Sequence, residues 1–237
     1  MAETGEDILV HVNGKVLSIL LVTNARAKRV SLRADPARGR VILIKPKQVS
    51  KVAAIEFAKD KAAWVLERLG EFLPSIPFAE GNLIPVLDVP HIIYHAPDAR
   101  RGVWREEGRL YVSGKAEHLP RRVRDWFKDE SLRIISPLAH KLAQRIDSNI
   151  SHISIRDPRS RWGSCSQDGR LSFSWRLLMA PDHVVQYIVA HEVAHLRELN
   201  HSEQFWQTVE ILTEHRDKAT LWIKQFGLDL HRYGLDY

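Results

Sequence analysis

The stretch RWGSCSQDGRLSFSWRLLMAPDHVVQYIVAHEVAHLRELNHSEQFW, from Arg161 to Trp206, contains an H-E-x-x-H motif and, six residues after it, a further histidine, His201. Apolar residues recur at helical spacing from Pro181 to Leu199, which predicts a helix with the motif in its middle. His191 and His195, four residues apart, then lie one turn apart on the same face of that helix. Their imidazole nitrogens can bind one Zn²⁺ ion.

A catalytic zinc ion usually has three protein ligands and one open position for water, so a third ligand is expected. Glu198 shares the helix face of His191, but a rise of about 1.5 Å per residue separates their backbones by roughly 10 Å. His201 is the better candidate. Asn200 before it tolerates the left-handed conformation in which helices often end, and Ser202 after it can cap a second helix, so the chain can turn back toward the metal.

Glu192 projects beside the two histidines of the motif. Its carboxylate can take a proton from a metal-bound water as a general base and later give that proton to the leaving group. The spacing to His201 also matches H-E-x-x-H-x-x-G-x-x-H, but Glu198 replaces the glycine and no methionine follows, which argues against a metzincin. The pattern predicts a zinc-dependent hydrolase of another kind.

The composition is that of a globular protein, with 237 residues, 44% of them hydrophobic, a net charge of +6 and one cysteine. A single cysteine, Cys165, excludes an intrachain disulfide and an all-cysteine zinc site and suits a reducing compartment. The N-terminal MAETGEDILV lacks the pattern of a signal peptide, and no window reaches the roughly 18 apolar residues of a membrane span. We therefore expect a soluble, cytoplasmic protein with no membrane partner.

Basic residues are concentrated in the N-terminal part of the chain. Residues 1–136 hold 23 Lys and Arg against 17 Asp and Glu, whereas residues 137–237 hold 12 of each. Such asymmetry can indicate attraction to nucleic acid, although a spread of basic residues over solvated faces is the more common reason. A nucleic-acid-associated protein with a structural zinc is therefore one alternative, against which Glu192 and an open fourth zinc position argue.

Strands and helices follow from the periodicity and the turn signals. Asn13-Gly14 predicts a hairpin between Ile8 and Asn24. Helices are expected at Ser50–Phe72 and His118–Asp147, the second one kinked or broken by Pro137. Further strands are expected at Val30–Arg33, Val41–Ile44, Leu83–Leu87, Ile92–His95, Gly102–Arg105 and Arg109–Val112, the last four in a second small antiparallel sheet.

These elements predict an α+β fold in two lobes. Residues 1–117 are expected to form an antiparallel, β-rich lobe with a long helix. Residues 118–237 are expected to form the hydrolase lobe, in which the helix with the H-E-x-x-H motif lies beside a small sheet.

Several motifs follow one another in the C-terminal half: R-W-G-S-C-S from Arg161, G-R-L from Gly169, H-E-V-A-H-L from His191, and N-H-S from Asn200 followed by Phe205-Trp206. Together they resemble the YgjP-like metallopeptidase family, related to the SprT-like and WLM zinc proteases. Residues 27–33 and 57–64 resemble the N-terminal region of that family, so the resemblance covers most of the chain. It implies a zincin-like C-terminal lobe and a single YgjP-like unit formed by the two lobes.

By this resemblance, His191, His195 and His201 are the zinc ligands and Glu192 is the catalytic residue, the same four residues that the spacing favours. The R-W-G-S-C segment would lie on the strands beside the metal. In zincin-like proteases an edge strand there pairs with an extended peptide substrate, and Leu171–Trp175 is the candidate strand.

Four side chains near these strands are candidate substrate contacts: Arg161, Arg170, Phe173 and Trp175. For the two aromatic residues, and for Trp162, packing in the core is the competing interpretation. Cys165 is expected to be a buried small hydrophobic residue rather than a nucleophile or a ligand.

Members resembling this chain have also been assigned a nucleoside triphosphate pyrophosphatase activity with UTP as substrate. Arginines near the expected strands could hold its phosphates by bidentate hydrogen bonds, with surface ion pairs as the alternative. This function predicts a compact pocket where arginines converge and Mg²⁺ as a further cofactor, whereas a peptidase predicts an extended groove. The arginines are Arg156, Arg159, Arg161, Arg170 and Arg176.

Overall fold

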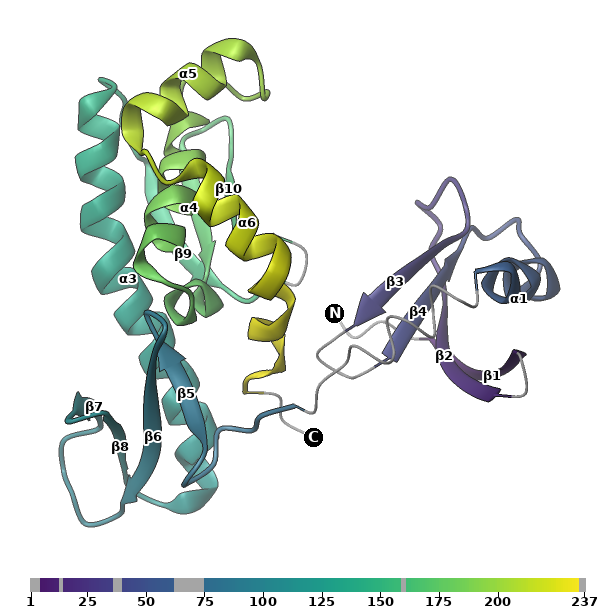
Figure 1. Ribbon diagram of the computed structural model, residues 1–237, viewed down its shortest axis with the longest axis horizontal. Helices are drawn as coiled ribbons and strands as arrows, with labels where there is room; N and C mark the ends of the chain where they lie inside the picture. The colour runs from purple at the N-terminus through teal and green to yellow at the C-terminus, as the bar shows by residue number, and fades with distance from the viewer. Residues whose placement is uncertain (1–4, 13–14, 36–39, 62–74, 159–160, 235–237) are drawn as a thin grey trace. The chain divides into compact units, whose positions relative to one another are not determined.

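A computed structural model describes residues 5–12, 15–35, 40–61, 75–158 and 161–234. The chain divides into two compact units, Met1–Ser75 and Ile76–Tyr237 (Figure 1). Both units contain strands and helices in separate runs, so the protein is a mixed α+β protein, as the sequence predicts.

The first unit contains a four-stranded sheet in the order β1-β2-β4-β3. Its hairpin is confirmed, because β1 and β2 are antiparallel with Val12 opposite Lys15. The expectation of a wholly antiparallel sheet was wrong, since β2 and β4 are parallel. Alternating apolar residues identify a strand but not its neighbour, and here the chain passes from β2 to β3 before β4 enters between them. The strands are β1 (Glu6–Val12), β2 (Lys15–Thr23), β3 (Ser31–Asp35) and β4 (Arg40–Lys45).

Helix α1 (Lys51–Asp60) packs on this sheet through Ala54 and Ala58. Ser50 caps it as predicted, because its Oγ accepts a hydrogen bond of 3.1 Å from the Ala53 amide. The part of the predicted helix from residue 62 to 72 lies outside the described residues.

The second unit begins with another four-stranded sheet, in the order β5-β6-β8-β7. All four strands lie where the sequence predicts them, but the sheet is mixed rather than antiparallel, because β6 and β8 are parallel. The strands are β5 (Leu83–Val86), β6 (Val89–Ala96), β7 (Val103–Glu106) and β8 (Arg109–Ser113).

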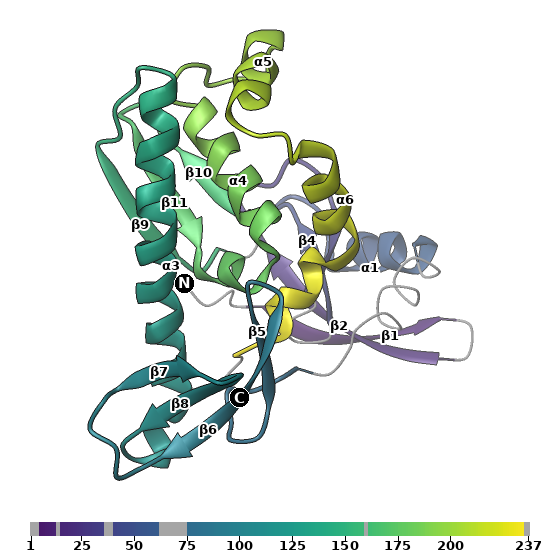
Figure 2. The same cartoon turned by 60° about the vertical axis from the view of Figure 1, so that its left-hand side comes forward.

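After a short 3-10 turn, η2 (Ala116–His118), helix α3 (Leu119–Arg145) runs unbroken through Pro137 (Figure 2). The predicted break does not occur. Pro137 is exposed, and its neighbours Ile135 and Ala139 remain fully buried, so the packed face of the helix is retained on both sides of the proline.

The remaining elements build a three-stranded sheet with helices around it. Its order is β10-β11-β9, with β11 parallel to β9 and antiparallel to β10. Helix α4 contacts β10, α3, α5 and α6. The elements are β9 (His152–Arg156), β10 (Gly163–Cys165), β11 (Arg170–Ser174), η3 (Trp175–Met179), α4 (Asp182–Ala194), α5 (Glu203–Leu212), α6 (Arg216–Phe226) and η4 (Gly227–Arg232).

The sheet β5–β8 belongs to the second unit because it shares that unit's core. Strands β7 and β8 contact α3, and the Leu87 amide donates a 2.7 Å hydrogen bond to the Leu178 carbonyl. The chain therefore divides after Ser75, earlier than the expected boundary at residue 117. Within the described ranges, no helix combines the length and apolar character needed to cross a bilayer.

Candidate metal centre

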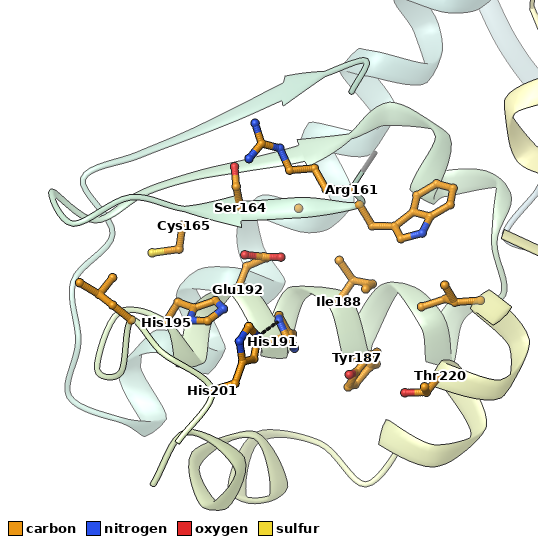
Figure 3. Close-up of a pocket in the computed structure, with 14 residues that line it drawn as sticks. Arg161, Ser164, Cys165, Tyr187, Ile188, His191, Glu192, His195, His201 and Thr220 are labelled. Atoms are coloured by element: carbon orange, nitrogen blue, oxygen red, sulfur yellow. Dashed lines mark hydrogen bonds between the residues drawn. The ribbon is translucent and has the colours of Figure 1, made fainter. Parts of the chain in front are cut away.

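Three histidines from two consecutive segments meet at the end of α4 (Figure 3). His191 lies in the last turn of α4, His195 immediately follows the helix, and His201 lies in the loop before α5. Their ring centroids are 5.1, 5.1 and 4.9 Å apart, and one nitrogen of each lies within 4.8 Å of those of the other two. Three nitrogen donors at this separation can share one metal ion.

The turn that brings His201 back differs in detail from the expected one. Helix α4 ends at Ala194, so the motif lies at its end rather than in its middle. Asn200 does not adopt the left-handed conformation; its Oδ1 instead accepts a hydrogen bond of 3.1 Å from the Ser202 amide. Ser202 caps α5 as predicted, accepting a hydrogen bond from the Phe205 amide at 3.2 Å. The two side-chain bonds fix the loop on which His201 lies.

The tautomer of His195 is set by the backbone. Its Nδ1 lies 2.9 Å from the carbonyl oxygen of Glu198, and a carbonyl can only accept, so Nδ1 carries the proton. Nε2 then has a free lone pair, as metal binding requires. Glu198 thus contributes its backbone oxygen, and its carboxylate is not part of the cluster.

His191 is kept neutral by its surroundings. Burial, and then the neighbouring His195 and His201, lower the pKa of its imidazole to about 4. Its Nε2 lies 3.2 Å from Nε2 of His201, so two ring nitrogens face the same point. The fully buried ring of Phe205 packs against all three imidazoles, at centroid distances of 4.5 to 5.0 Å. Imidazoles that converge on one point and pack against one buried ring fit a divalent ion of the zinc type.

Glu192 points from α4 toward β10 (Figure 3). Its side chain is 6% exposed, and burial raises the pKa of its carboxyl to about 8, against the opposing effect of Arg161. The backbone of Gly163 lies directly against it: a Cβ added at Gly163 would be 2.5 Å from Cγ and 2.7 Å from Oε1 of Glu192. Only a residue without a side chain leaves room for this carboxylate.

A cavity of about 480 Å³ opens beside these groups. Figure 3 places Tyr187, Ile188 and Thr220 on one side of the histidines and Cys165 on the other. Together with Trp162 and Ile223, Tyr187 and Ile188 form what we call the apolar recess. The remaining lining residues are Arg161, Gly163, Ser164, His191, Glu192, His195, Leu199 and His201.

One long side of the cavity is the open edge of β10. Two backbone hydrogen bonds flank β10 and join its segment to that of β11. The Ser174 amide donates to the Trp162 carbonyl at 2.9 Å, and the Ser166 amide donates to the Arg170 carbonyl at 3.0 Å. Bonded and non-bonded pairs alternate along an antiparallel ladder, so Gly163 and Cys165 direct their N–H and C=O groups away from β11. No strand covers this side of β10 in the described sheet.

Comparison with known proteins matches residues 28–226 to the family described as YgjP-like, metallopeptidase domain. The chain belongs to the YgjP-like family. The match confirms the resemblance seen in the motifs and makes the protein a member of a family of metal-dependent hydrolases, for which zinc is the typical ion.

A search of curated proteins finds no match to this YgjP-like chain. Among solved structures, one similar to it is described as the metallopeptidase zymogen of Pyrococcus abyssi abylysin. The two are 19% identical, the similarity covers 40% of this chain and 96% of the other, and the TM-score is 0.36. A likeness this distant transfers no property.

The strand expected to pair with substrate is not at an edge. β11 lies between β10 and β9 and is hydrogen-bonded on both sides, so Leu171–Trp175 has no free backbone groups for a peptide. β10 is the edge strand beside the histidines. The error has a physical source, because the alternation of apolar and polar residues in β11, R-L-S-F-S, identifies a strand but does not show whether it lies at an edge of the sheet.

Of the four candidate substrate contacts, the structure brings only Arg161 to the cavity. Arg170 is exposed and pairs with Asp168 at 2.5 Å. Phe173 and Trp175 are wholly buried in the core, with no surface to offer a substrate, so their assignment is corrected to the competing interpretation. Trp175 packs against Phe127 at a centroid distance of 5.6 Å.

Arg156 and Arg176, the other two candidate arginines with a described position, do not line the cavity. Arg176 is buried, donates to Asp157 at 2.9 Å and to the carbonyls of Leu230 and Tyr233, and thus ties the C-terminal segment to the sheet. Arg156 is exposed and lies 3.4 Å from the Ser154 hydroxyl. Arg159 lies outside the described residues.

Cys165 is half-buried and lines the cavity. Burial, and then the charges of Glu192 and Asp168, raise the pKa of its thiol to about 11. A thiol that stays protonated at neutral pH is a poor nucleophile and a poor ligand. The expectation of a buried side chain is not met, because Cys165 is half-buried and reaches the cavity.

Sequence reasoning missed the apolar recess. Tyr187 and Ile188 precede His191 by four and three residues, so helical spacing could have placed them beside it. Ile223 and Thr220 come from α6, and no local pattern in the sequence indicates that α6 packs beside α4.

Proposed function

We propose that this YgjP-like protein is a zinc-dependent peptidase in which His191, His195 and His201 hold the metal and Glu192 is the general base. The observation that carries the proposal is the open edge of β10, which lies along the same cavity as the histidines and Glu192. An extended peptide can pair with such an edge and place a scissile amide beside them. The combination of an H-E-x-x-H helix with a neighbouring edge strand supports a zincin-like arrangement of the second unit.

Zinc, when bound, supplies Lewis acidity, which acidifies water and polarises a carbonyl group. The chain's own residues supply the rest. The Glu192 carboxylate takes the proton of the attacking water and returns it to the departing amine. Burial raises the pKa of this carboxyl in the metal-free site, and a divalent cation held by the neighbouring histidines would lower it and favour the ionised form that acts as a base. Gly163 leaves the space in which the carboxylate moves between the two positions.

The substrate is held by the backbone of β10 and by the apolar recess. The N–H and C=O groups of Gly163 and Cys165 are available for two pairs of ladder hydrogen bonds with a peptide. Trp162, Ile188 and Ile223 then receive an apolar side chain of that peptide. We therefore infer a preference for a large apolar residue next to the scissile bond, on the side of the recess.

A nucleotide pyrophosphatase would need basic groups that converge on the phosphates. Among the described arginines, Arg161 alone lines the cavity, while Arg170 and Arg176 are engaged with Asp168 and Asp157. No observation in the described structure favours the nucleotide substrate or a Mg²⁺ cofactor. A purely structural zinc is disfavoured too, because such sites are closed, whereas these histidines line an open cavity.

The test compares wild type with Glu192→Gln, both with measured zinc content, on a mixed peptide library and a panel of nucleoside triphosphates. The matched control is Glu203→Gln, the same chemical change at an exposed position of α5. We expect peptide cleavage by wild type and the control, and at least about a hundredfold loss in Glu192→Gln with zinc retained. Nucleotide hydrolysis without peptide cleavage, or full activity of Glu192→Gln, would refute the proposal.

A further inference from the structure

The first unit carries a basic surface that the proposed hydrolase does not use. β2 and β3 lie on opposite sides of β4, so the link from Asn24 to Val30 must cross the end of β4. At that end of the sheet, the link from β2 to β3 lies beside the turn that leads from β4 to α1. The Asn24 amide donates to the Lys45 carbonyl at 2.9 Å and joins the two segments.

These two segments contain no acidic residue. Residues 24–33 hold four Lys and Arg, residues 45–51 hold three, and neither holds Asp or Glu. These two segments therefore bring seven basic residues and no acidic residue to this end of the sheet, where Glu6 of β1 is paired with Lys51.

Four of the basic side chains are exposed and free. Within the described residues, the side chains of Arg26, Lys28, Arg29 and Lys47 make no hydrogen bond and no ion pair. We call these four the basic surface. Lys51, by contrast, pairs with Glu6 at 2.6 Å.

The backbone beneath the basic surface is held in place. Asn24 Oδ1 accepts from the Arg26 amide at 2.9 Å, and the Asn24 carbonyl accepts from the Ala27 amide at 3.1 Å. In the neighbouring turn, Lys45 Nζ donates to the Val49 carbonyl at 2.8 Å. Ordered turns reduce the entropy lost when a ligand is bound.

We propose that the basic surface of the first unit binds the phosphate backbone of nucleic acid. Arginine can grip a phosphate by two parallel hydrogen bonds and lysine by a single charged one, and several phosphates lie within reach of two adjacent turns. This surface belongs to the first unit and gives the protein a second, sequence-independent binding activity.

A membrane is the less suitable polyanion. Peripheral binding to a bilayer needs exposed aromatic or long aliphatic side chains beside the charges. The two segments contain only Val30, Leu32 and Val49 as sizeable apolar residues, and Val30 and Leu32 pack against the core of the first unit. The basic surface therefore has positive charge but no exposed apolar side chain that could insert into a bilayer.

The size of the effect follows from counterion release. Neutralising four phosphates of a duplex gives a slope of log K against log salt of about −3.6, or a loss of affinity of roughly a hundredfold between 50 and 200 mM salt. Removing the four charges should abolish most of this dependence.

The experiment measures binding of the full chain to fluorescein-labelled 20-base-pair DNA and to 20-nucleotide RNA by anisotropy, at several KCl concentrations. The test variant changes Arg26, Lys28, Arg29 and Lys47 to Gln. A control variant changes four exposed basic residues of the second unit to Gln and so has the same net charge; they are Arg100, Lys141, Lys218 and Lys224. Circular dichroism melts verify that all three proteins are folded.

We expect the test variant to lose affinity for at least one probe by about tenfold or more and to flatten its salt dependence, and the control to change by less than about threefold. Absence of binding to both probes at 50 mM KCl would overturn the proposal, as would equal losses in the two variants. Binding to vesicles of anionic lipid without binding to either probe would overturn it in favour of a membrane partner.

Discussion

Strands β10 and β11 lie side by side in the same small sheet, yet they serve opposite purposes. β11 contributes Leu171 and Phe173, both fully buried, and is paired on both sides. β10 reads Gly-Ser-Cys, has one free edge, and presents that edge to the cavity with Glu192. The apolar residues of β11 identify it as a strand in the sequence, but they are buried and serve the packing of the core.

The contrast separates a structural strand from the strand to which the proposed function assigns the substrate. The central strand is paired on both sides, whereas the edge strand has unpaired backbone groups and, at Gly163, leaves space for the Glu192 carboxylate. A short polar strand without bulky side chains is suited to accept a substrate because nothing on it blocks the approach.

The sharpest test of this contrast is Gly163→Val on β10. The new side chain would collide with Glu192, since even a Cβ would lie 2.5 Å from its Cγ. We expect kcat/KM for a peptide to fall by about a hundredfold, equivalent to about 2.7 kcal/mol, with zinc content retained. Ser172→Val, on the adjacent strand β11, is the control and should keep most of the activity. Comparable losses in both would contradict the special role of β10.

On β11 we expect a substitution to reduce stability and to leave the activity of the folded protein nearly unchanged. Phe173→Ala removes a wholly buried ring and should lower the free energy of unfolding by about 3 to 5 kcal/mol. Below its lowered melting temperature, the folded fraction should retain a kcat/KM close to that of wild type. Urea denaturation and peptide turnover measured on one preparation would separate the two effects; a large loss of activity at unchanged stability would place Phe173 in the site.

Narrowing the apolar recess should alter selectivity more than overall activity. Ile223→Trp places a larger side chain at the wall that α6 contributes. For peptides with a large apolar residue at this position we expect kcat/KM to fall by about tenfold, and for peptides with alanine there to stay nearly constant. A parallel fall for both peptide series would mean that the recess does not bind the substrate side chain.

The smallest effect concerns the thiol of Cys165. With a pKa of about 11, only about one thiol in a thousand is ionised at pH 8. Because the pKa is raised, alkylation by iodoacetamide should be slow at neutral pH and should accelerate about tenfold per pH unit up to pH 10. Mass spectrometry follows the reaction, and rapid alkylation at pH 7 would contradict the assignment of Cys165 as an inert residue.

The histidine cluster was predictable because its geometry is local. Two histidines on one turn of a helix and a third after a capped loop are separated by only ten residues, so backbone geometry alone brings them together. The strands of the first unit and of the sheet β5–β8 were predictable for the same reason, from alternation and turn residues within each segment, whereas β9 was not predicted.

The remainder depends on contacts between distant segments. The parallel pairing of β2 with β4 and of β6 with β8 could not be predicted from the alternation of apolar and polar residues within each strand. The same holds for the placement of α6 beside α4, and for Arg176, whose buried carbonyl partners lie 54 and 57 residues later in the chain. The sequence alone does not show whether a charged residue binds a ligand or stabilises the fold.

The most direct test of the proposed site measures zinc stoichiometry and peptide turnover together in wild type, Glu192→Gln and His201→Ala, after dialysis against one low zinc concentration. We predict one zinc per chain in wild type and in Glu192→Gln, loss of zinc in His201→Ala, and turnover in wild type alone. Turnover by Glu192→Gln at the wild-type rate, or full zinc content and activity in His201→Ala, would contradict the assignment.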